Sequence, residues 1–165
     1  MYQECHGLYR VVGVKVRFYV EDMLFFKYIG CATVAKTLYR QLSSMNGVTV
    51  SWKGLPGQAD LEHYHTFGPL ALTQRRMAKG KTVLTAHSTP RINIGNISLA
   101  RAINKRYPKI YRKFGHIITI SRPCHEEVTA MVPEMPVTFI PNGVNREFFR
   151  KDEEKRAAFR EMYQI

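Results

Sequence analysis

The side chain best suited to chemistry in this 165-residue sequence is that of His87. It follows Thr82–Ala86, a run of β-branched and apolar residues that predicts a strand, so His87 stands at the carboxyl end of that strand. An imidazole there donates to a sugar hydroxyl or a phosphate, or moves a proton near neutral pH. A histidine bonded only to local backbone is the alternative interpretation.

Two further loops carry weaker signals. Gly30 opens a predicted helix, where a phosphate can approach backbone N–H groups at the positive end of the helix dipole. A glycine needed only for the turn is the alternative, because neither a GxGxxG nor a Walker pattern is present. Asn142-Gly143, after Pro141, predicts a turn with positive φ.

Histidine and cysteine pairs suggest other chemistry. His63 and His65 alternate with Tyr64 on a predicted strand and so share one face, but no third metal ligand accompanies them, and we expect no metal site. Cys124 precedes a histidine and resembles a thiol nucleophile. Without a partner at a defined spacing, a buried structural cysteine is the favoured interpretation.

The elements that must position these residues alternate between strands and helices. Such alternation predicts an α/β fold, a Rossmann-like parallel sheet of about six strands with helices on both faces. Ligands then bind outside the carboxyl ends of the strands. The expected strands are Val14–Val20, Val48–Trp52, Leu61–His65, Thr82–Ala86, His116–Ile120 and Val137–Ile140. The expected helices are Thr33–Met45, Pro69–Lys79, Ile97–Phe114 kinked or split at Pro108, one around Glu126–Met131 with Ser121 as N-cap, and Glu153–Tyr163.

Charge is unevenly distributed along the chain. The formal net charge is +12, and residues 63–125 hold twelve Lys and Arg with no Asp or Glu. The rest of the chain is neutral overall, which excludes a uniformly basic, histone-like protein. One electropositive region facing an anionic partner is predicted.

Composition also indicates the cellular compartment of the protein. Three widely separated cysteines without a CxxC favour a reducing cytoplasm over a disulfide framework. The first 20 residues lack the apolar core of a secretory signal, and no run of about 18 apolar residues predicts a membrane span.

In order and spacing, five segments resemble the N-terminal, acceptor-side domain of a GT-B glycosyltransferase of the family 4 type. The resemblance covers about residues 15–165, and the last segment is similar to the interdomain signature of that family. The segments are Val16–Asp22 with Ile29–Val34, Asp60–Ala71, Thr82–Pro90, Ile117–Ser121, and Phe139–Phe149.

The resemblance implies transfer of a sugar from a nucleotide-sugar to an acceptor, with retention of configuration and no metal or other cofactor. It places Gly30 and Cys31 against the donor diphosphate and His87 beside the transferred sugar. The acceptor-side residues would be Asp22, Tyr28 and Arg91, and the interdomain residues Asn142, Gly143 and Asn145.

Two positions depart from the family pattern. Cys31 stands where a second glycine is usual, and its Cβ narrows the approach to a phosphate; Asn145 stands where aspartate is common. The resemblance also implies that a second domain supplies most donor contacts. We therefore expect residues 1–150 to form one domain, 151–165 a helix leading to that second domain in cis or in trans, and the chain alone to be inactive or nearly so.

A basic amphipathic segment dominates residues 98–114. Such a segment can lie on an anionic membrane surface. We expect a cytoplasmic protein, peripheral on the inner face of the cell membrane, with a sugar or lipid-linked acceptor. An ordinary helix with its basic side in water is the alternative. The cations are Arg101, Lys105, Arg106, Lys109, Arg112 and Lys113.

Two other functions stay open. One is a non-catalytic Rossmann-like module that binds a membrane or a catalytic partner. The other is a basic nucleic-acid-binding protein, with Tyr107, Tyr111 and Phe114 stacking on bases, although no nucleic-acid-binding motif accompanies them and specific binding is not expected. The donor sugar, the acceptor and the oligomeric state are not fixed by the sequence.

Overall fold

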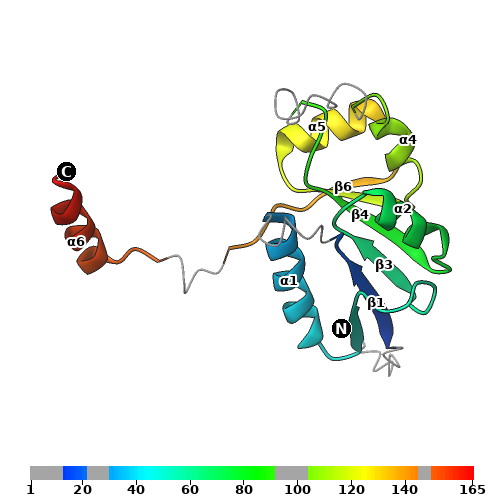
Figure 1. The fold of residues 1–165 in the computed structure, drawn as a ribbon, viewed down its shortest axis with the longest axis horizontal. Coiled ribbons are helices and arrows are strands. Elements are labelled where there is room, and N and C mark those ends of the chain that lie inside the picture. Colours follow the sequence, from blue (N-terminus) through cyan, green and yellow to red (C-terminus); the bar gives the residue numbers. More distant parts are fainter. Residues whose placement is uncertain (1–12, 22–29, 92–103, 145–149) are drawn as a thin grey trace, which may run out of the picture.

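The computed structural model describes residues 13–21, 30–91, 104–144 and 150–165. These residues form a six-stranded, all-parallel sheet with helices on both faces (Figure 1), which confirms the predicted Rossmann-like α/β fold. The strands are β1 (Val14–Tyr19), β2 (Val48–Trp52), β3 (Leu61–Tyr64), β4 (Lys81–Ala86), β5 (His116–Thr119) and β6 (Val137–Phe139). The helices are α1 (Gly30–Ser43), α2 (Pro69–Arg76), α4 (Tyr107–Tyr111), α5 (Arg122–Met131) and α6 (Glu153–Tyr163).

The strand order β2-β1-β3-β4-β5-β6 sets the position of the switch point. The chain moves outward from β1 to β2, then crosses back to β3 on the other side of β1 and continues in one direction. Phe18 accordingly pairs with Trp52 of β2 and with His63 of β3. Connections diverge between β1 and β3, and ligands of open α/β sheets bind outside the carboxyl ends of the strands at such a point.

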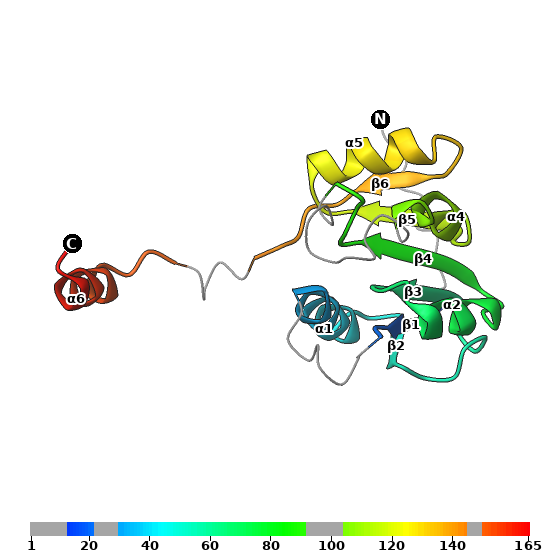
Figure 2. The ribbon, with the colours of Figure 1, turned by 45° about the horizontal axis from the view of Figure 1, so that its top comes forward.

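The two faces of the sheet are covered by different helices (Figures 1 and 2). Along β1, Phe18 points to the face covered by α1, and Tyr19 points to the face covered by α2, α4 and α5. The larger apolar core lies on the second face and contains Tyr64, Leu84, Tyr111, Ile117, Val128 and their buried neighbours. A smaller core under α1 contains Val20, Ala32 and Ala35, with Trp52 packed against them.

Helix boundaries follow local signals with small shifts. Helix α1 begins at Gly30, three residues earlier than the predicted start. Helix α5 begins at Arg122, because Ser121 is its N-cap and accepts the Cys124 N–H at 3.4 Å. The N-cap prediction is therefore confirmed, while the predicted start near Glu126 is one turn late.

The predicted helical segment Ile97–Phe114, kinked or split at Pro108, is split in the part that the structure describes: Asn104 is helical, residues 105–106 form a turn, and α4 follows. Pro108 lies in the first turn of α4, which spans only Tyr107–Tyr111. Proline is tolerated there because the first-turn N–H groups have no partner within the helix. The proline thus begins a short helix, and the earlier part of the predicted one, 97–103, lies outside the described residues.

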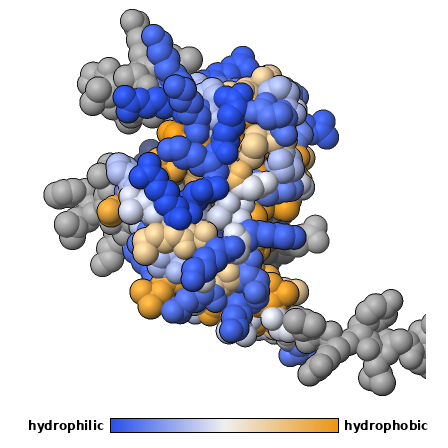
Figure 3. Space-filling model, turned by 90° about the vertical axis from the view of Figure 1, so that its right-hand side faces the viewer, coloured by the Kyte–Doolittle hydropathy of each residue, from blue (hydrophilic) through white to orange (hydrophobic). Residues whose placement is uncertain are grey.

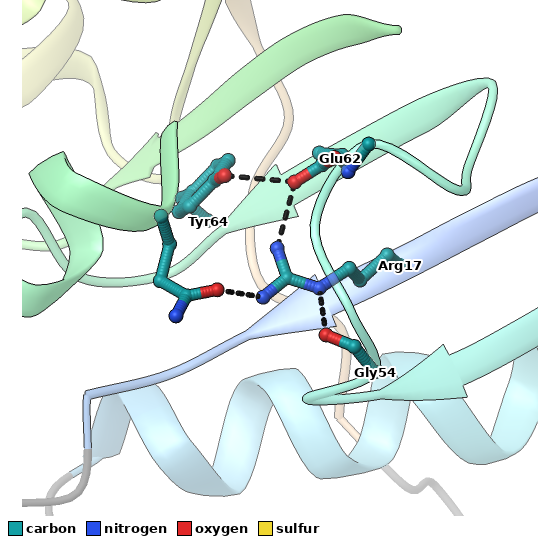
Figure 4. A network of polar contacts seen from close by, with 6 residues as sticks. Arg17, Gly54, Glu62 and Tyr64 are labelled. Carbon is teal, nitrogen blue, oxygen red and sulfur yellow. Dashed lines mark hydrogen bonds and ion pairs between the residues drawn. The ribbon is translucent and has the colours of Figure 1, made fainter. Parts of the chain in front are cut away.

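A buried ion pair joins β1 to β3 under α2 (Figure 4). Arg17 Nη1 lies 2.7 Å from Glu62 Oε2, and both side chains are almost fully buried. Arg17 also donates to the carbonyl of Gly54 at 2.6 Å and to the Gln74 side chain at 2.7 Å, while Tyr64 donates to Glu62 at 2.8 Å. The network ties two strands, a loop and a helix, and no sequence pattern predicted it.

Helix α6 lies apart from the sheet in Figure 1. Asp152 caps it by accepting the Lys155 N–H at 3.0 Å, and none of its residues is buried. The helix itself is confirmed, and its role as a lead into a second domain stays a prediction.

Candidate functional site

Three neighbouring strands bring the main candidates to one edge of the sheet. Gly30 starts the helix that follows β1, His65 directly follows β3, and His87 directly follows β4. Because the strands are parallel and adjacent, all three positions belong to the carboxyl edge, next to the switch point. The predicted location of the site is thus consistent with the topology.

The ends of β1 and β3 are fastened to each other by Glu21. Its backbone N–H donates to Thr66 Oγ1 at 2.7 Å, and its carboxylate accepts the N–H groups of Leu70 and Ala71 at the start of α2. A carboxylate there satisfies orphan donors and complements the helix dipole. The space for this carboxylate exists because residue 68 is a glycine, since a Cβ at that position would lie 2.1 Å from Glu21 Oε2.

A row of histidines runs along the α1 face toward the carboxyl edge. His63 Nε2 lies 2.7 Å from Thr85 Oγ1, and the rings of His63 and His65 are 4.3 Å apart. His65 Nδ1 lies 3.1 Å from His87 Nε2, and Phe18 stacks on the His65 ring. The sequence predicted the shared face of His63 and His65 but not the contact with His87.

Burial keeps these histidines neutral at physiological pH. Desolvation lowers the pKa of His63 to about 4, with a further contribution from His87, and lowers the pKa of His87 itself to about 4. For His65, desolvation and then the two neighbouring imidazoles lower the pKa to about 2. His87 is therefore suited to hydrogen bonding as a neutral ring, rather than to proton transfer near pH 7.

The loop that follows His87 is held by α4, by α5 and by Asn104, three residues before α4. Tyr111 donates its hydroxyl to the Ser88 carbonyl at 2.9 Å, and Asn104 donates its amide to the Pro90 carbonyl at 3.2 Å. The backbone N–H of Arg91 donates to Glu127 at 2.9 Å. The Arg91 residue itself is exposed. The loop is thereby fixed over residues 88–91.

The two donor-side candidates differ in exposure. Gly30 is exposed, and a Cβ built on it would meet nothing within 4 Å, so packing alone does not require glycine there. Cys31 is half-buried. Phosphate contact by either residue stays a prediction.

The interdomain prediction is partly corrected. Asn142 and Gly143 are exposed as they leave β6, but Gly143 does not have a positive φ and the pair forms no turn. The chain leaves the sheet after β6 without a turn over residues 141–144 (Figure 1), so the turn predicted from Asn-Gly is wrong. Four predicted site residues lie outside the described residues: Asp22, Tyr28, Arg101 and Asn145.

Neither a metal site nor a thiol nucleophile is supported. Among residues 13–21, 30–91, 104–144 and 150–165, no group of three His, Cys, Asp or Glu side chains is arranged to hold a metal ion. Cys124 is buried with its Sγ 3.5 Å from the Ala86 carbonyl, and burial raises the pKa of its thiol. It is the structural cysteine that the sequence favoured.

The basic segment presents its cations on the α4 side of the molecule. Lys105, Arg106 and Lys109 are exposed, and Lys113 is half-buried. Arg112 forms an ion pair with Glu134, which offsets its charge. Figure 3 looks onto the side that carries α2 and α4, where hydrophilic residues predominate.

The aromatic rings that could stack on nucleic-acid bases are in the core. Tyr107 and Tyr111 of α4 and the nearby Phe114 are each at most 2% exposed and pack into the larger apolar core. This contradicts the stacking role considered for them and removes the main support for a nucleic-acid-binding function. In the part of the chain that the structure describes, no helix has the length and apolarity needed to cross a membrane.

Comparison with known proteins decides the family. Residues 35–148 match the family model described as Glycosyltransferase Family 4. The chain belongs to this family. The glycosyltransferase resemblance seen in the sequence is thereby confirmed, and the matched residues include His65, His87, Asn142 and Gly143.

A curated relative of this glycosyltransferase domain is the alpha-galactosylglucosyldiacylglycerol synthase of Streptococcus pneumoniae. The two are 30% identical over 102 residues, which are 58% of this chain and 27% of the relative. The matched part thus spans about a quarter of the length of that enzyme.

Two residues of the site were missed by sequence reasoning. Glu21 caps a helix that begins 48 residues later, at Pro69, and His65 was considered only as a metal ligand. The available signal was position in the chain. Glu21 lies two residues after β1 and His65 lies directly after β3, and the partner of each follows a neighbouring strand. Strand order, which fixes those neighbours, is not readable from the sequence.

Proposed function

We propose that this domain forms the acceptor-side half of a retaining glycosyltransferase, which moves a sugar from a nucleotide-sugar to a lipid-linked acceptor at a membrane surface. The observation that carries the proposal is the family match over residues 35–148. The S. pneumoniae relative is named as a synthase of a glycosylated diacylglycerol, and this name supports the proposal of a lipid acceptor.

The carboxyl edge of the sheet is the proposed reaction face. There His87 hydrogen-bonds the transferred sugar as a neutral imidazole, and Gly30 and Cys31 lie against the donor diphosphate at the N-terminus of α1. Arg91, with Asp22 and Tyr28, faces the acceptor. Asn142, Gly143 and Asn145 belong to the crossing between domains. We propose no metal or other cofactor.

Membrane docking is proposed for the side that carries α4. Lys105, Arg106 and Lys109 are exposed there, and each cation near an anionic bilayer contributes about 1 kcal/mol. The protein would then be cytoplasmic and peripheral on the inner face of the cell membrane.

A second domain, in the same chain or in a partner, is proposed to supply most of the donor contacts. Such a domain would supply the charges that stabilise the departing diphosphate. We therefore expect no sugar transfer by these 165 residues alone. Robust transfer by the purified chain would contradict this part of the proposal.

Mapping of ligand contacts by NMR tests the reaction face. The ¹⁵N-labelled chain is titrated with a glycosylated diacylglycerol in phosphatidylcholine bicelles, and separately with a uridine diphosphate sugar. The largest amide shifts are expected at Gly30, His65 and His87. Shifts at Lys15, Gly57 and Lys81, at the opposite edge of the sheet, would contradict the proposal.

The same titration separates the competing function. Binding to bicelles without any sugar-dependent shift at the carboxyl edge would favour a non-catalytic module that only holds a membrane or a partner. Empty phosphatidylcholine bicelles are the matched control for lipid contact alone.

A further inference from the structure

The contact between His65 and His87 has a consequence for the proposed sugar-binding ring. His65 Nδ1 and His87 Nε2 lie 3.1 Å apart, and two neutral imidazoles make such a contact only when one donates and the other accepts. Each direction of donation fixes a different tautomer on His87. The ring nitrogen of His87 outside the contact, Nδ1, is then either a donor or an acceptor.

The surroundings of His65 decide between the two directions. His65 is 2% exposed, its ring contacts the rings of Phe18 and His63, and its Nε2 has no hydrogen-bond partner among the described residues. If His87 donated, the His65 proton would sit on Nε2 as a buried N–H without an acceptor. If His65 donates, its Nε2 is a bare acceptor, and an unsatisfied acceptor is better tolerated in protein interiors than an orphaned N–H.

We propose that His65 is a positioning residue, which donates its Nδ1–H to His87 Nε2 and so holds His87 as the Nδ1–H tautomer. His87 then presents a hydrogen-bond donor at Nδ1. A donor suits a hydroxyl or phosphate oxygen of a sugar ligand, so the inference deepens the proposed function and rests on it for the identity of the ligand.

The rest of the row holds His65 in place. Thr85 Oγ1 hydrogen-bonds His63 Nε2 at 2.7 Å, and the His63 ring packs against His65. The His65 N–H donates to the Tyr19 carbonyl at 2.9 Å, which continues the parallel pairing one residue past β3. His65 is thus fixed by both its backbone and its ring, as a positioning role requires. Burial also keeps the pKa of both rings far below 7, so neutral tautomers are the relevant species at that pH.

Long-range ¹H–¹⁵N correlation spectra of the histidine rings test the assignment in the whole 165-residue chain at pH 7. The pattern expected for His87 is that of Nδ1–H with a bare Nε2. An Nε2–H pattern for His87 in the unsubstituted protein would overturn the proposal without any variant.

Substitution of the donor tests the dependence on His65. His65→Asn keeps an N–H near the position of Nδ1 and is expected to preserve the Nδ1–H pattern of His87. His65→Leu removes the donor, and the Nδ1–H pattern is expected to be lost or mixed with Nε2–H. His116→Leu, on β5 away from the row, is the control. An unchanged His87 pattern in a folded His65→Leu protein would also overturn the proposal.

These spectra need no sugar, so their outcome is separate from that of the proposed function. A correct tautomer with no ligand shift at His87 would leave His65 as the positioning residue and contradict only the sugar-binding role.

Discussion

At the residue scale, the three histidines on the α1 face make folding sensitive to acid. Their folded pKa values lie near 4, 2 and 4, below the value of about 6.5 for an exposed histidine. Between pH 6.5 and the folded pKa values, the unfolded chain therefore binds more protons than the folded chain, and folding must release those protons. The stabilisation is fully present above about pH 6.5 and is lost as the pH falls through that range.

The first prediction concerns this pH range. The free energy of unfolding, measured by urea denaturation at a series of pH values, should fall between pH 7 and pH 4 by the order of 3 kcal/mol for each of the three histidines, since one pKa unit corresponds to about 1.4 kcal/mol. His65→Leu should make the dependence shallower. An equally steep dependence in that variant would contradict the burial account of its pKa.

The second prediction concerns the ion pair of Arg17 and Glu62. Glu62→Gln removes the carboxylate and leaves a guanidinium that is 1% exposed without its counter-charge. Loss of one partner of a buried pair costs about 3–5 kcal/mol, and urea denaturation should show a decrease of that size.

A double-mutant cycle supplies the control. Arg17→Met combined with Glu62→Gln should cost clearly less than the sum of the single changes, because the uncompensated charge is then absent. Additive losses would mean that the two side chains do not act as a pair.

At the element scale, the start of α2 depends on a residue from β1 and a glycine from the β3 loop. Gly68 has φ −65°, a conformation open to any residue, so the requirement for glycine is space for the Glu21 carboxylate. This arrangement couples the ends of β1 and β3 at the switch point.

The third prediction follows from that space. Gly68→Ala should displace Glu21 and remove its cap from α2, which costs about 1 kcal/mol in the free energy of unfolding. Gly143→Ala is the matched control: its Cβ would meet nothing within 4 Å, and the change should stay within about 0.5 kcal/mol. Equal changes in the free energy of unfolding for the two substitutions would contradict the capping role of Glu21.

How far the sequence predicts the elements depends on the range of the signals involved. Strands such as Thr82–Ala86 and helix α6 were predicted because their residue types and period are local. At Pro108 the sequence left a kink and a split both open, because a proline that kinks a helix and one that begins a helix differ only in tertiary context. The Asn142-Gly143 turn was wrong because Asn-Gly expresses only a local preference, and the backbone over residues 141–144 forms no turn.

The site was predictable in position but not in its contacts. His87 was selected because it follows a strand, and His65 was seen to share a face with His63. The pairing of His65 with His87 spans 22 residues and exists only because β3 lies beside β4. The Arg17–Glu62 pair spans 45 residues and depends in the same way on β1 lying beside β3.

At the scale of the whole molecule, both faces of the sheet carry exposed cations. The α4 side presents Lys105 and Lys109, and α1, on the opposite face, presents Lys36 and Arg40. Membrane docking through one side predicts that only one of these pairs matters.

The fourth prediction is tested by vesicle co-sedimentation at low salt. The chain should bind vesicles with anionic phosphatidylglycerol and lose binding in neutral phosphatidylcholine and at high salt. Lys105→Glu with Lys109→Glu should weaken binding at least tenfold. Lys36→Glu with Arg40→Glu makes the same change in net charge and should have a smaller effect. Equal effects would indicate attraction by net charge alone.

Sugar transfer itself tests the central claim most directly. A chimera in which this chain replaces the matching 102 residues of the S. pneumoniae synthase is assayed for transfer of radiolabelled sugar from a nucleotide-sugar to diacylglycerol-based lipid. We predict transfer by the chimera, none by the chain alone, and a loss of at least tenfold on His87→Ala but not on His116→Ala. A folded chimera that binds the nucleotide-sugar yet transfers nothing, or one that transfers equally well without His87, would contradict the account.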